Sequence, residues 1–347
     1  MDQRAYREII SGQSRTVTAL LLRFLLRIPA IFYTAVIAIR NLLYSTGCLK
    51  THHADAIVIS VGNITTGGTG KTPTVIWLCN QLTGKSAILT RGYKSTQSGK
   101  DEPAILAENC PDSKVIINSD RVAGAAEAIE KFGANVLILD DGFQHRRLHR
   151  DIDIVTIDAT IPFGYGKLLP AGSLREPITS LKRAHAVIIT RSDQIEDLET
   201  IEQKLLSVNE ELIIARAIHK PKVARTIDGE QITLDELKGK RVFAFCAIGN
   251  PQAFFDTLTK LGTRIVGSKI YNDHYHYSNN DIDDICTQAE QLNADLVLTT
   301  QKDCNKITAS QNKAMAYLEI EMDIFSGAGQ IRDLIETTLT DRIPKNI

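Results

Sequence analysis

The sequence contains little cysteine, and its cysteines form no recognisable motif. There are six among 347 residues, and no two of them form a C-x-x-C pair. Scattered cysteines are typical of a reducing, cytoplasmic compartment, and they exclude a disulfide-rich secreted scaffold. We expect ordinary buried thiols at Cys48, Cys79, Cys110, Cys246, Cys286 and Cys304.

The sequence also lacks an uninterrupted hydrophobic run long enough to cross a bilayer. The most apolar segment, residues 17–39, is interrupted by Arg23 and Arg27, and its longest unbroken stretch, Ile28–Ile39, has 12 residues. Such a stretch spans about 18 Å as a helix, whereas a bilayer core of roughly 30 Å needs about 20 residues. The two arginines share one helical face because they are four residues apart. The pattern favours an amphipathic helix in a membrane interface; the alternative is a helix packed on the protein's own core.

Net charge is nearly absent, but the charges are unevenly distributed. The whole chain carries −1, whereas residues 1–50 carry +5 and residues 51–347 carry −6. A basic end predicts an anionic partner, which is either a membrane or a nucleic acid. The 43% of hydrophobic residues suffice for a packed core. The mean hydropathy of −0.08 excludes a polytopic membrane protein.

Beyond residue 55, short apolar segments alternate with helical ones. Each apolar segment ends in polar or glycine residues, and this pattern predicts a parallel sheet with helices on both faces. The predicted strands are Ala56–Val61, Ser86–Leu89, Val115–Ile117, Val136–Leu139, Ile152–Ile157, Ala186–Ile189, Arg241–Ala247, Thr263–Val266 and Leu296–Thr299.

A glycine-rich loop directly follows the first predicted strand. Its residues are Gly67, Gly68, Thr69, Gly70, Lys71 and Thr72. In a phosphate-binding loop, backbone N–H groups surround phosphate oxygens, the lysine adds a positive charge, and the threonine hydroxyl binds Mg²⁺. The G-x-x-x-x-G-K-[ST] pattern is incomplete because Thr65 replaces its first glycine. The strand–loop–helix context nevertheless favours phosphate binding over a chance turn.

A second motif supports a nucleotide site. The predicted strand Val136–Leu139 runs directly into Asp140 and Asp141. Carboxylates at the carboxyl end of such a strand face the crevice where Mg²⁺ is held, although Asp-Asp-Gly is also a common turn. With the loop at Lys71, the pair predicts metal binding by Thr72, Asp140 and Asp141.

The predicted fold is an α/β protein with a P-loop NTPase-like α/β/α sandwich. Its length predicts two domains, and the strand–helix pattern breaks near Pro221, which suggests a linker. We predict an N-terminal membrane-interface helix at residues 1–45, a nucleotide-binding domain at 46–218, a smaller α/β domain at 222–322 that closes a cleft, and a C-terminal helix region at 323–347 that packs back on the first domain.

The residues after Asp141 narrow the interpretation. Residues 140–148 read DDGFQHRRL and are followed by Arg150 and Asp151. This segment resembles the signature of the tetraacyldisaccharide 4′-kinase family, the lipid A 4′-kinases of Gram-negative envelope synthesis. Gln301 and Tyr275 depart from the family pattern, which usually has glutamate and a second histidine there. Further blocks agree in chain order up to about residue 305: VGN at 61–63, the loop with Pro73, RGY at 91–93, DEP at 101–103, Asp120-Arg121, LPAG at 169–172, LREP at 174–177, Asp273-His274 and Lys302-Asp303.

The resemblance implies a reaction and its catalytic residues. The reaction is transfer of the γ-phosphoryl group of ATP, with Mg²⁺, to the 4′-hydroxyl of a tetraacyl glucosamine disaccharide 1-phosphate, which yields lipid IVA. Asp101 would accept the hydroxyl proton, supported by His274 from the second domain, while Lys71, Asp140 and Asp141 act on the phosphates and metal. Without the resemblance, Asp101 would be assigned to a turn and His274 to a structural or surface role.

The resemblance also implies residues that bind the acceptor. Several lie in loops or just after strands, where binding groups are common, and an arginine fork engages phosphate oxygens bidentately. A single exposed arginine is more often simply solvated, and a histidine such as His145 is nearly as often structural. The predicted acceptor-binding residues are Arg91, Tyr93, Arg121, Gln144, His145, Arg175 and Glu176.

The predicted partners are the acylated glucosamine disaccharide 1-phosphate and an anionic membrane surface. Nucleic acid is not expected, because the basic cluster at residues 146–150 has no interleaved aromatic residues and no nucleic-acid-binding fold motif. No obligate protein partner is inferred. The expected location is the cytoplasmic face of the bacterial inner membrane, peripheral or monotopic. Thr190–Asp193 is weakly similar to a nucleobase-reading motif and receives no assignment.

Three other classes of function compete with this prediction. A membrane-associated P-loop ATPase or GTPase switch explains Lys71 and the two aspartates, but not the arginines offered to a second ligand. A binding module with a degenerate nucleotide site conflicts with the intact loop. A soluble sugar or nucleoside kinase would leave the basic, apolar amino terminus merely packed on the core.

Overall fold

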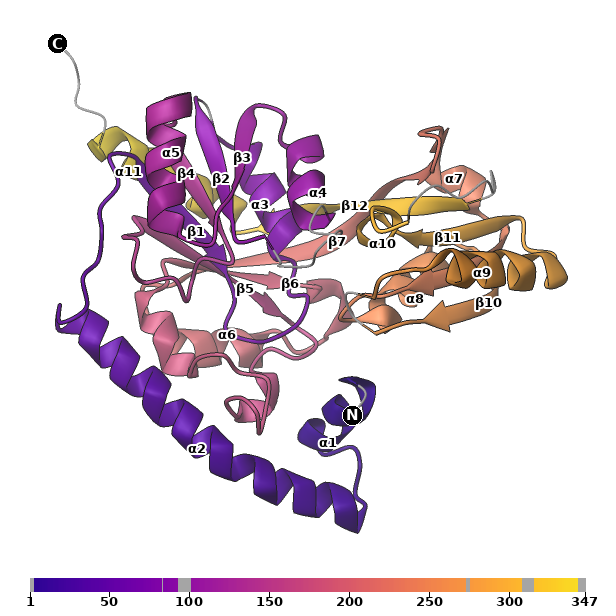
Figure 1. Ribbon diagram of the computed structural model, residues 1–347, viewed down its shortest axis with the longest axis horizontal. Helices are drawn as coiled ribbons and strands as arrows, with labels where there is room; N and C mark the ends of the chain where they lie inside the picture. Colours follow the sequence, from indigo (N-terminus) through magenta and orange to yellow (C-terminus); the bar gives the residue numbers. More distant parts are fainter. Residues whose placement is uncertain (1–2, 83, 93–100, 273–274, 308–314, 343–347) are drawn as a thin grey trace.

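The computed structural model describes residues 3–82, 84–92, 101–272, 275–307 and 315–342. Their strands form one continuous sheet in the order β10-β9-β11-β12-β7-β6-β5-β1-β4-β2-β3, and β8 pairs with β7 (Figure 1). We call β1–β6 with their helices the first lobe and β8–β11 with theirs the second lobe. The strands are β1 (Ile57–Gly62), β2 (Ser86–Thr90), β3 (Ser113–Ile117), β4 (Val136–Asp140), β5 (Ile152–Asp158), β6 (Ala186–Thr190), β7 (Ile213–Thr226), β8 (Gln231–Ile232), β9 (Arg241–Cys246), β10 (Arg264–Ile270), β11 (Leu296–Thr300) and β12 (Met315–Ser326).

Each strand predicted from the sequence is present and begins close to its predicted start. All neighbouring strands among β1–β6 are parallel, so their carboxyl ends meet at one edge of the sheet. The α-helices are α1 (Gln3–Ser11), α2 (Val17–Ser45), α3 (Lys71–Cys79), α4 (Asp101–Asn109), α5 (Arg121–Phe132), α6 (Glu199–Leu206), α7 (Leu234–Leu237), α8 (Pro251–Lys260), α9 (Asn279–Gln291), α10 (Gln301–Cys304) and α11 (Ala328–Arg342), with 3-10 turns η1 (Gly164–Gly166), η2 (Ile178–Arg183) and η3 (Ser192–Gln194).

Helices cover both faces of the sheet because successive strand residues point to opposite sides. In β4, Val136 and Ile138 pack with α3 and α11, whereas Leu137 packs against α5. In β9 of the second lobe, Val242 packs with α7 and α8, whereas Phe243 packs against α9. Each lobe is therefore a three-layer α/β/α sandwich, and the predicted fold class is confirmed.

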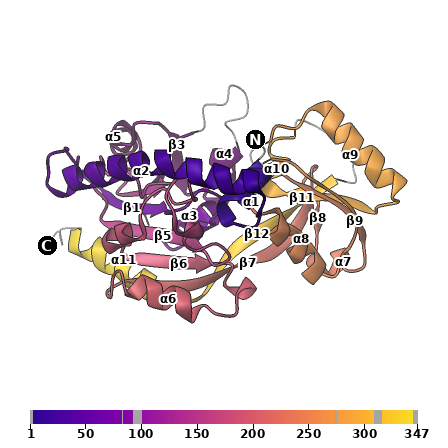
Figure 2. The ribbon, with the colours of Figure 1, turned by 90° about the horizontal axis from the view of Figure 1, so that it is seen from below.

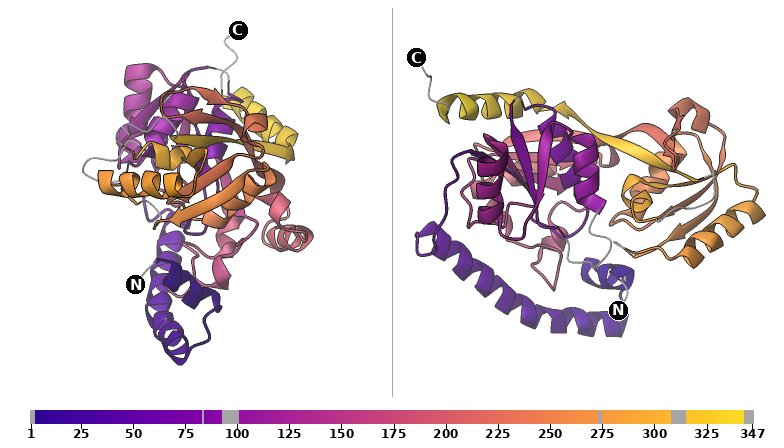
Figure 3. Two further views of the ribbon diagram at one scale, coloured as in Figure 1. Left: turned by 90° about the vertical axis from the view of Figure 1, so that its right-hand side faces the viewer. Right: turned by 45° about the horizontal axis from the view of Figure 1, so that its top comes forward.

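Two long strands, β7 and β12, connect the lobes. They pair in antiparallel fashion, and Figure 3 shows β12 crossing from one lobe to the other. The linker expected near Pro221 is a strand instead, and the predicted boundary between residues 218 and 222 falls inside β7. Pro221 pairs with Ile320 at a shift in register, because an irregular position tolerates the missing proline N–H. The domain division itself stays a prediction.

Helix α2 stands apart from the sheet and runs alongside the first lobe (Figures 1 and 2). It has 29 residues and ends at Ser45, beyond the predicted apolar segment. Among the described residues it is the one helix whose length and composition would suffice to cross a membrane. Some core helices and signal sequences have the same length and composition. Several hydrogen bonds hold it to the first lobe. Among them, Tyr33 Oη donates to the Arg175 carbonyl at 2.9 Å, Asn41 Nδ2 donates to Glu176 Oε2 at 3.1 Å, and Arg146 Nη1 donates to the Asn41 carbonyl at 2.9 Å.

The last helix, α11, returns to the first lobe. Ile331 and Ile335 are buried in the same apolar cluster as Ile57 and Ile59 of β1. Arg342 near its end donates from Nη1 to the Ala56 carbonyl at 2.9 Å. The carboxyl-terminal part of the chain thus completes one face of the first lobe.

Candidate phosphoryl-transfer site

The glycine-rich loop lies between β1 and α3, at the carboxyl edge of the sheet. Gly70 precedes α3 with a φ of 88°, a left-handed conformation that favours glycine. Beneath the loop, Thr69 Oγ1 lies 2.7 Å from Thr156 Oγ1 of β5 and accepts from Asn63 Nδ2 at 3.0 Å. The loop is therefore fixed on the central strands, and it places the positive end of α3 where an anion would bind.

Lys71, the first residue of α3, faces the carboxylate that follows β4. Its Nζ lies 3.6 Å from Asp141 Oδ1, and Arg175 Nη1 donates to both carboxylate oxygens of Asp141 at 3.0 Å. Asp141 has a φ of 55°, which is unusual outside glycine and typical of strained functional sites. The structure thus brings together three of the predicted site residues from separate parts of the chain.

Asp140 differs sharply from its neighbour. Its side chain is buried at the end of β4 and accepts a hydrogen bond from Thr90 Oγ1 at 3.2 Å. Burial, followed by the charge of Glu102, raises the pKa of Asp140 to about 6. Burial also raises the pKa of Asp141, but Lys71 and Arg175 lower it by more, so that its net shift is downward. Two adjacent carboxylates therefore have opposite electrostatic environments.

This contrast predicts opposite effects on stability. Because the folded-state pKa of Asp140 lies above its ordinary value of 3.8, its charge destabilises the fold above pH 6, and the penalty disappears as the pH falls toward 4. We expect Asp140→Asn to raise the free energy of unfolding at pH 8 by about 1–3 kcal/mol, with a smaller gain at pH 5.

The matched control is Asp141→Asn. Because the pKa of Asp141 is lowered, its charge stabilises the fold above its unfolded pKa, and this stabilisation disappears as the pH falls through the folded value. We expect Asp141→Asn to lower the stability at pH 8. Urea denaturation followed by the fluorescence of Trp77, the single tryptophan, measures both changes. Shifts of the same sign at pH 8 would contradict the assignment.

The predicted magnesium ligands suit that ion. Mg²⁺ is usually held by one or two carboxylates together with substrate phosphates and water, rather than by a cage of protein side chains. Among the described residues there is no group of three or more His, Cys, Asp or Glu side chains placed to hold a metal. The raised pKa of the buried Asp140 marks a site where a bound cation would favour the ionised form.

The predicted acceptor-binding residues have diverse surroundings. Arg91 is exposed just after β2. Arg121 is buried, and its Nη1 and Nη2 donate to the carbonyls of Asn118 and Asp140 at 2.6 and 3.1 Å. Gln144 Nε2 donates to the Asn63 carbonyl at 2.8 Å. Arg121 thus joins the segment after β3 to the end of β4, and Gln144 binds the segment that follows β1.

His145 is half-buried, and Glu176 is fully buried. Burial, followed by the charges of Arg121 and Arg150, lowers the pKa of His145 to about 4, so its imidazole is neutral at pH 7. The Glu176 side chain is fully buried, and Arg183 Nη2 donates to its two oxygens at 2.9 and 2.8 Å. Glu176 therefore links Arg183 to Asn41 of α2.

The remaining catalytic candidates are only partly visible. Tyr93 and His274 lie outside the described residues. Asp101 begins α4, and its side chain also falls outside the description. Their predicted roles stay predictions.

Sequence reasoning assigned no role to the turn after β6. Thr190 Oγ1 donates to the Thr69 carbonyl at 3.0 Å, and Arg191 Nη1 donates to the Gly68 carbonyl at 3.1 Å and pairs with Asp158. Arg191 adopts a left-handed conformation with a φ of 54°. These residues hold the glycine-rich loop from the end of β6. The sequence feature that could have identified them is their position directly after a predicted strand.

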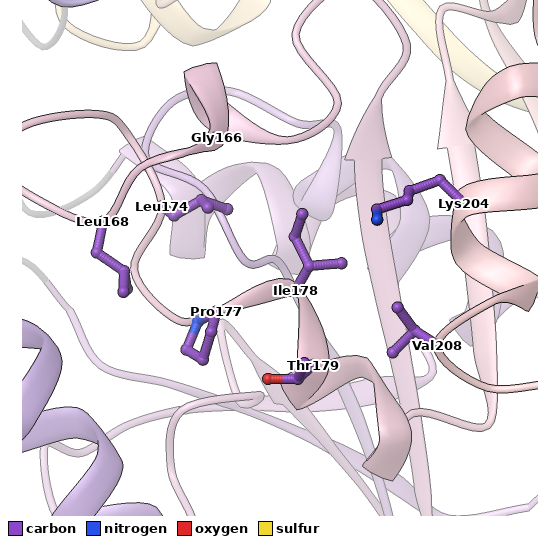
Figure 4. A pocket seen from close by; sticks show the side chains of 8 residues that line it. All are labelled: Gly166, Leu168, Leu174, Pro177, Ile178, Thr179, Lys204 and Val208. Carbon is purple, nitrogen blue, oxygen red and sulfur yellow. The ribbon is translucent and has the colours of Figure 1, made fainter.

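A separate apolar pocket of about 300 Å³ lies between α6 and the segment around η1 and η2 (Figure 4). None of the residues of the phosphate-loop site lines it. Its lining residues are Gly166, Leu168, Leu174, Pro177, Ile178, Thr179, Lys204 and Val208.

A glycine-rich loop after the first strand and two carboxylates at the end of its neighbour are typical of P-loop nucleotide-binding proteins. A family model described as tetraacyldisaccharide-1-P 4′-kinase matches residues 22–340. The chain belongs to this family, and it is a kinase.

Individual relatives agree along most of the chain. A tetraacyldisaccharide 4′-kinase of Halothermothrix orenii is 36% identical over 338 residues, covering 88% of each chain. A tetraacyldisaccharide 4′-kinase of Syntrophus aciditrophicus is 38% identical over 336 residues, covering 86% of this chain and 89% of its own. The crystal structure of LpxK from Aquifex aeolicus in complex with ATP is similar with a TM-score of 0.73 and 29% identity, covering 91% of this chain and 99% of the other.

Proposed function

We propose that this protein transfers the γ-phosphoryl group of ATP to the 4′-hydroxyl of a tetraacyl glucosamine disaccharide 1-phosphate and so forms lipid IVA. The observation that carries the proposal is the cluster of Lys71, Asp141 and Arg175 beside the phosphate loop. Its residues come from three of the sequence blocks that resemble the family. The neighbouring relatives are named for this activity or contain ATP.

Phosphoryl transfer depends on positioning and on neutralising charge. Lys71 and the loop N–H groups would hold the β- and γ-phosphates, while Thr72, Asp140 and Asp141 would hold Mg²⁺. When bound, that ion neutralises charge on the phosphate oxygens. Asp101 would accept the proton of the acceptor hydroxyl, with His274 in support. Among the candidate arginines, Arg91 is exposed and available to an anionic acceptor.

The direct test is an assay with purified protein, Mg-ATP and the tetraacyl disaccharide 1-phosphate. We expect a product heavier by one phosphoryl group and no comparable ATP turnover without the lipid. The competing ATPase or GTPase switch predicts the reverse result, in which nucleotide is hydrolysed without acceptor and the lipid stays unchanged.

We further propose that α2 lies in the interface of the cytoplasmic leaflet of the inner membrane. Many of its large apolar side chains are exposed, and burial of such side chains in the acyl boundary is favourable. Arg23 and Arg27 lie on the same helix and suit anionic lipid phosphates. The exposed apolar residues are Val17, Leu20, Leu21, Phe24, Leu25, Ile28, Ile31, Phe32, Val36, Ile39 and Leu42.

Replacing two of these residues is expected to weaken membrane binding. Phe24 and Phe32 are 63% and 69% exposed. Each contributes about 1.5–3 kcal/mol when fully buried in an apolar phase. Because burial in the interface is partial, we expect the double variant Phe24→Ser/Phe32→Ser to bind vesicles containing anionic phospholipid roughly 10–100-fold more weakly in co-sedimentation. Phe325→Ser on β12, which is 57% exposed, is the control and should bind normally. Unchanged binding of the double variant would contradict the proposal.

A further inference from the structure

Lys302 of the second lobe reaches across to the first lobe. Its Nζ lies 3.1 Å from Glu102 Oε1, an ion pair between residues 200 positions apart in the sequence. Lys302 belongs to α10, which directly follows β11, and Glu102 lies in the first turn of α4. Both side chains are largely shielded from solvent, with exposures of 25% and 29%. Such shielding strengthens an ion pair relative to one at the open surface.

Hydrogen bonds fix the short helix α10 in the second lobe, and this sets the direction of Lys302. Thr300 caps it by accepting a hydrogen bond from the Asp303 N–H at 3.1 Å. The Asp303 side chain is fully buried and accepts hydrogen bonds from Thr300 Oγ1 at 2.7 Å, from the Ala247 N–H at 3.0 Å and from Lys306 Nζ at 3.3 Å. Because Asp303 anchors the helix in the second lobe, its neighbour Lys302 is directed toward α4.

Glu102 lies at the start of α4, beside residues that the proposed reaction uses. It directly follows Asp101, the proposed proton acceptor, and its charge acts on Asp140 at the end of β4. Helix α4 packs on the phosphate-loop helix through Leu106, which shares a buried cluster with Val75 of α3. A displacement of the first turn of α4 would therefore move Asp101 relative to the phosphates.

We propose that Lys302 is a positioning residue for phosphoryl transfer: by holding Glu102 it fixes the first turn of α4, and with it Asp101, against the phosphate loop. This inference rests on the proposed function. In this proposal the second lobe helps to position Asp101 through the Lys302–Glu102 ion pair. This role is separate from any second-lobe residue that contacts the acceptor itself.

A second ion pair between the lobes provides a matched control. Lys260 Nζ of α8 lies 3.0 Å from Asp193 Oδ2 of η3, and these side chains are 62% and 40% exposed. Exposed pairs of this kind contribute little to stability. Removing the Lys260 pair shows how much kcat changes when an ion pair between the lobes is lost without a change next to Asp101.

The experiment measures steady-state kinetics with Mg-ATP and the tetraacyl disaccharide 1-phosphate in mixed micelles. We expect Lys302→Met to lower kcat roughly 10–100-fold, because small misplacements of a reacting group have effects of this size. The KM for ATP should stay within about threefold of wild type, since the phosphate loop is intact. Lys302→Arg should restore most of kcat, and Lys260→Met should resemble wild type.

The reciprocal variant keeps the inference testable if Lys302→Met does not fold. Glu102→Gln removes the same ion pair from the other side and should also lower kcat. The double variant Glu102→Gln/Lys302→Met should lose little more than the more severe single variant, because the two residues act as one unit. The inference is overturned if Lys302→Met keeps wild-type kcat, if arginine does not rescue it, or if Lys260→Met loses as much. A wild-type protein inactive on this lipid would instead overturn the proposed function.

Discussion

Replacement of Lys71 by methionine is expected to lower kcat for lipid phosphorylation by roughly 10²–10³-fold, the usual effect of removing one preorganised group that stabilises developing negative charge. Lys71 is the first residue of α3, and its side chain is only 17% exposed. Its ammonium lies 3.6 Å from Asp141 Oδ1, whose side chain is 37% exposed. Charge interactions in such a partly shielded site are stronger than in water. We also expect a higher KM for ATP.

Two further variants sharpen this prediction. Lys71→Arg keeps the charge but replaces a compact ammonium with a planar fork, so it should recover only part of the activity. Lys131→Met is the control, because Lys131 is 66% exposed and pairs with Glu127 one turn earlier on α5. Phosphorylated lipid is quantified by mass spectrometry. A Lys71→Met rate within about threefold of wild type would refute the assignment of the loop to phosphate binding.

Replacement of Arg183 by methionine is expected to destabilise the first lobe by about 3–5 kcal/mol, the typical effect of leaving a buried charge without its partner. The Glu176 side chain is fully buried, and Arg183 donates two hydrogen bonds to it. The Arg183 guanidinium also lies 3.8 Å from the centroid of the Phe143 ring. Methionine would keep part of the apolar contact, but the Glu176 carboxylate would lose its positive partner and keep the hydrogen bond from the Asn41 amide.

The control for this prediction is a similar ion pair at the surface. Arg147 pairs with Asp120 at 2.9 Å, and their side chains are 48% and 41% exposed. We expect Arg147→Met to change stability by less than about 1 kcal/mol. The double variant Arg183→Met/Glu176→Gln should be more stable than Arg183→Met alone, since the uncompensated charge is gone. Denaturation followed by Trp77 fluorescence measures all three, and equal losses for Arg183→Met and Arg147→Met would contradict the interpretation.

The central parallel strands of the first lobe were predictable because they are buried on both faces. Strands such as β4 and β6 read as continuous apolar runs, and their burial is complete. The connecting strand β7 was not predicted, because its buried and partly exposed residues follow no simple alternation. It also contains Pro221, which is usually read as a break. Its regular structure depends on pairing with β12, about a hundred residues later in the chain.

The candidate site was predictable only where its pattern is local. The phosphate loop and the two aspartates each follow a strand within a few residues, so their positions follow from the sheet. The sequence does not reveal that Arg175 reaches Asp141 while the adjacent Glu176 turns to Arg183. Such partners are set by tertiary packing, and Arg183 itself carries no signal in the sequence.

The attachment of α2 to the site affects which acceptor concentration should determine the rate. Tyr33 and Asn41 bind the main chain of Arg175 and the side chain of Glu176, and Arg175 in turn holds Asp141. In the proposed membrane orientation, the height of the reactive centre above the bilayer is thus set by a short chain of contacts. An enzyme fixed in this way samples its lipid acceptor in two dimensions. Its rate should therefore follow the mole fraction of acceptor in the surface, and inert detergent or lipid should slow it at constant bulk concentration.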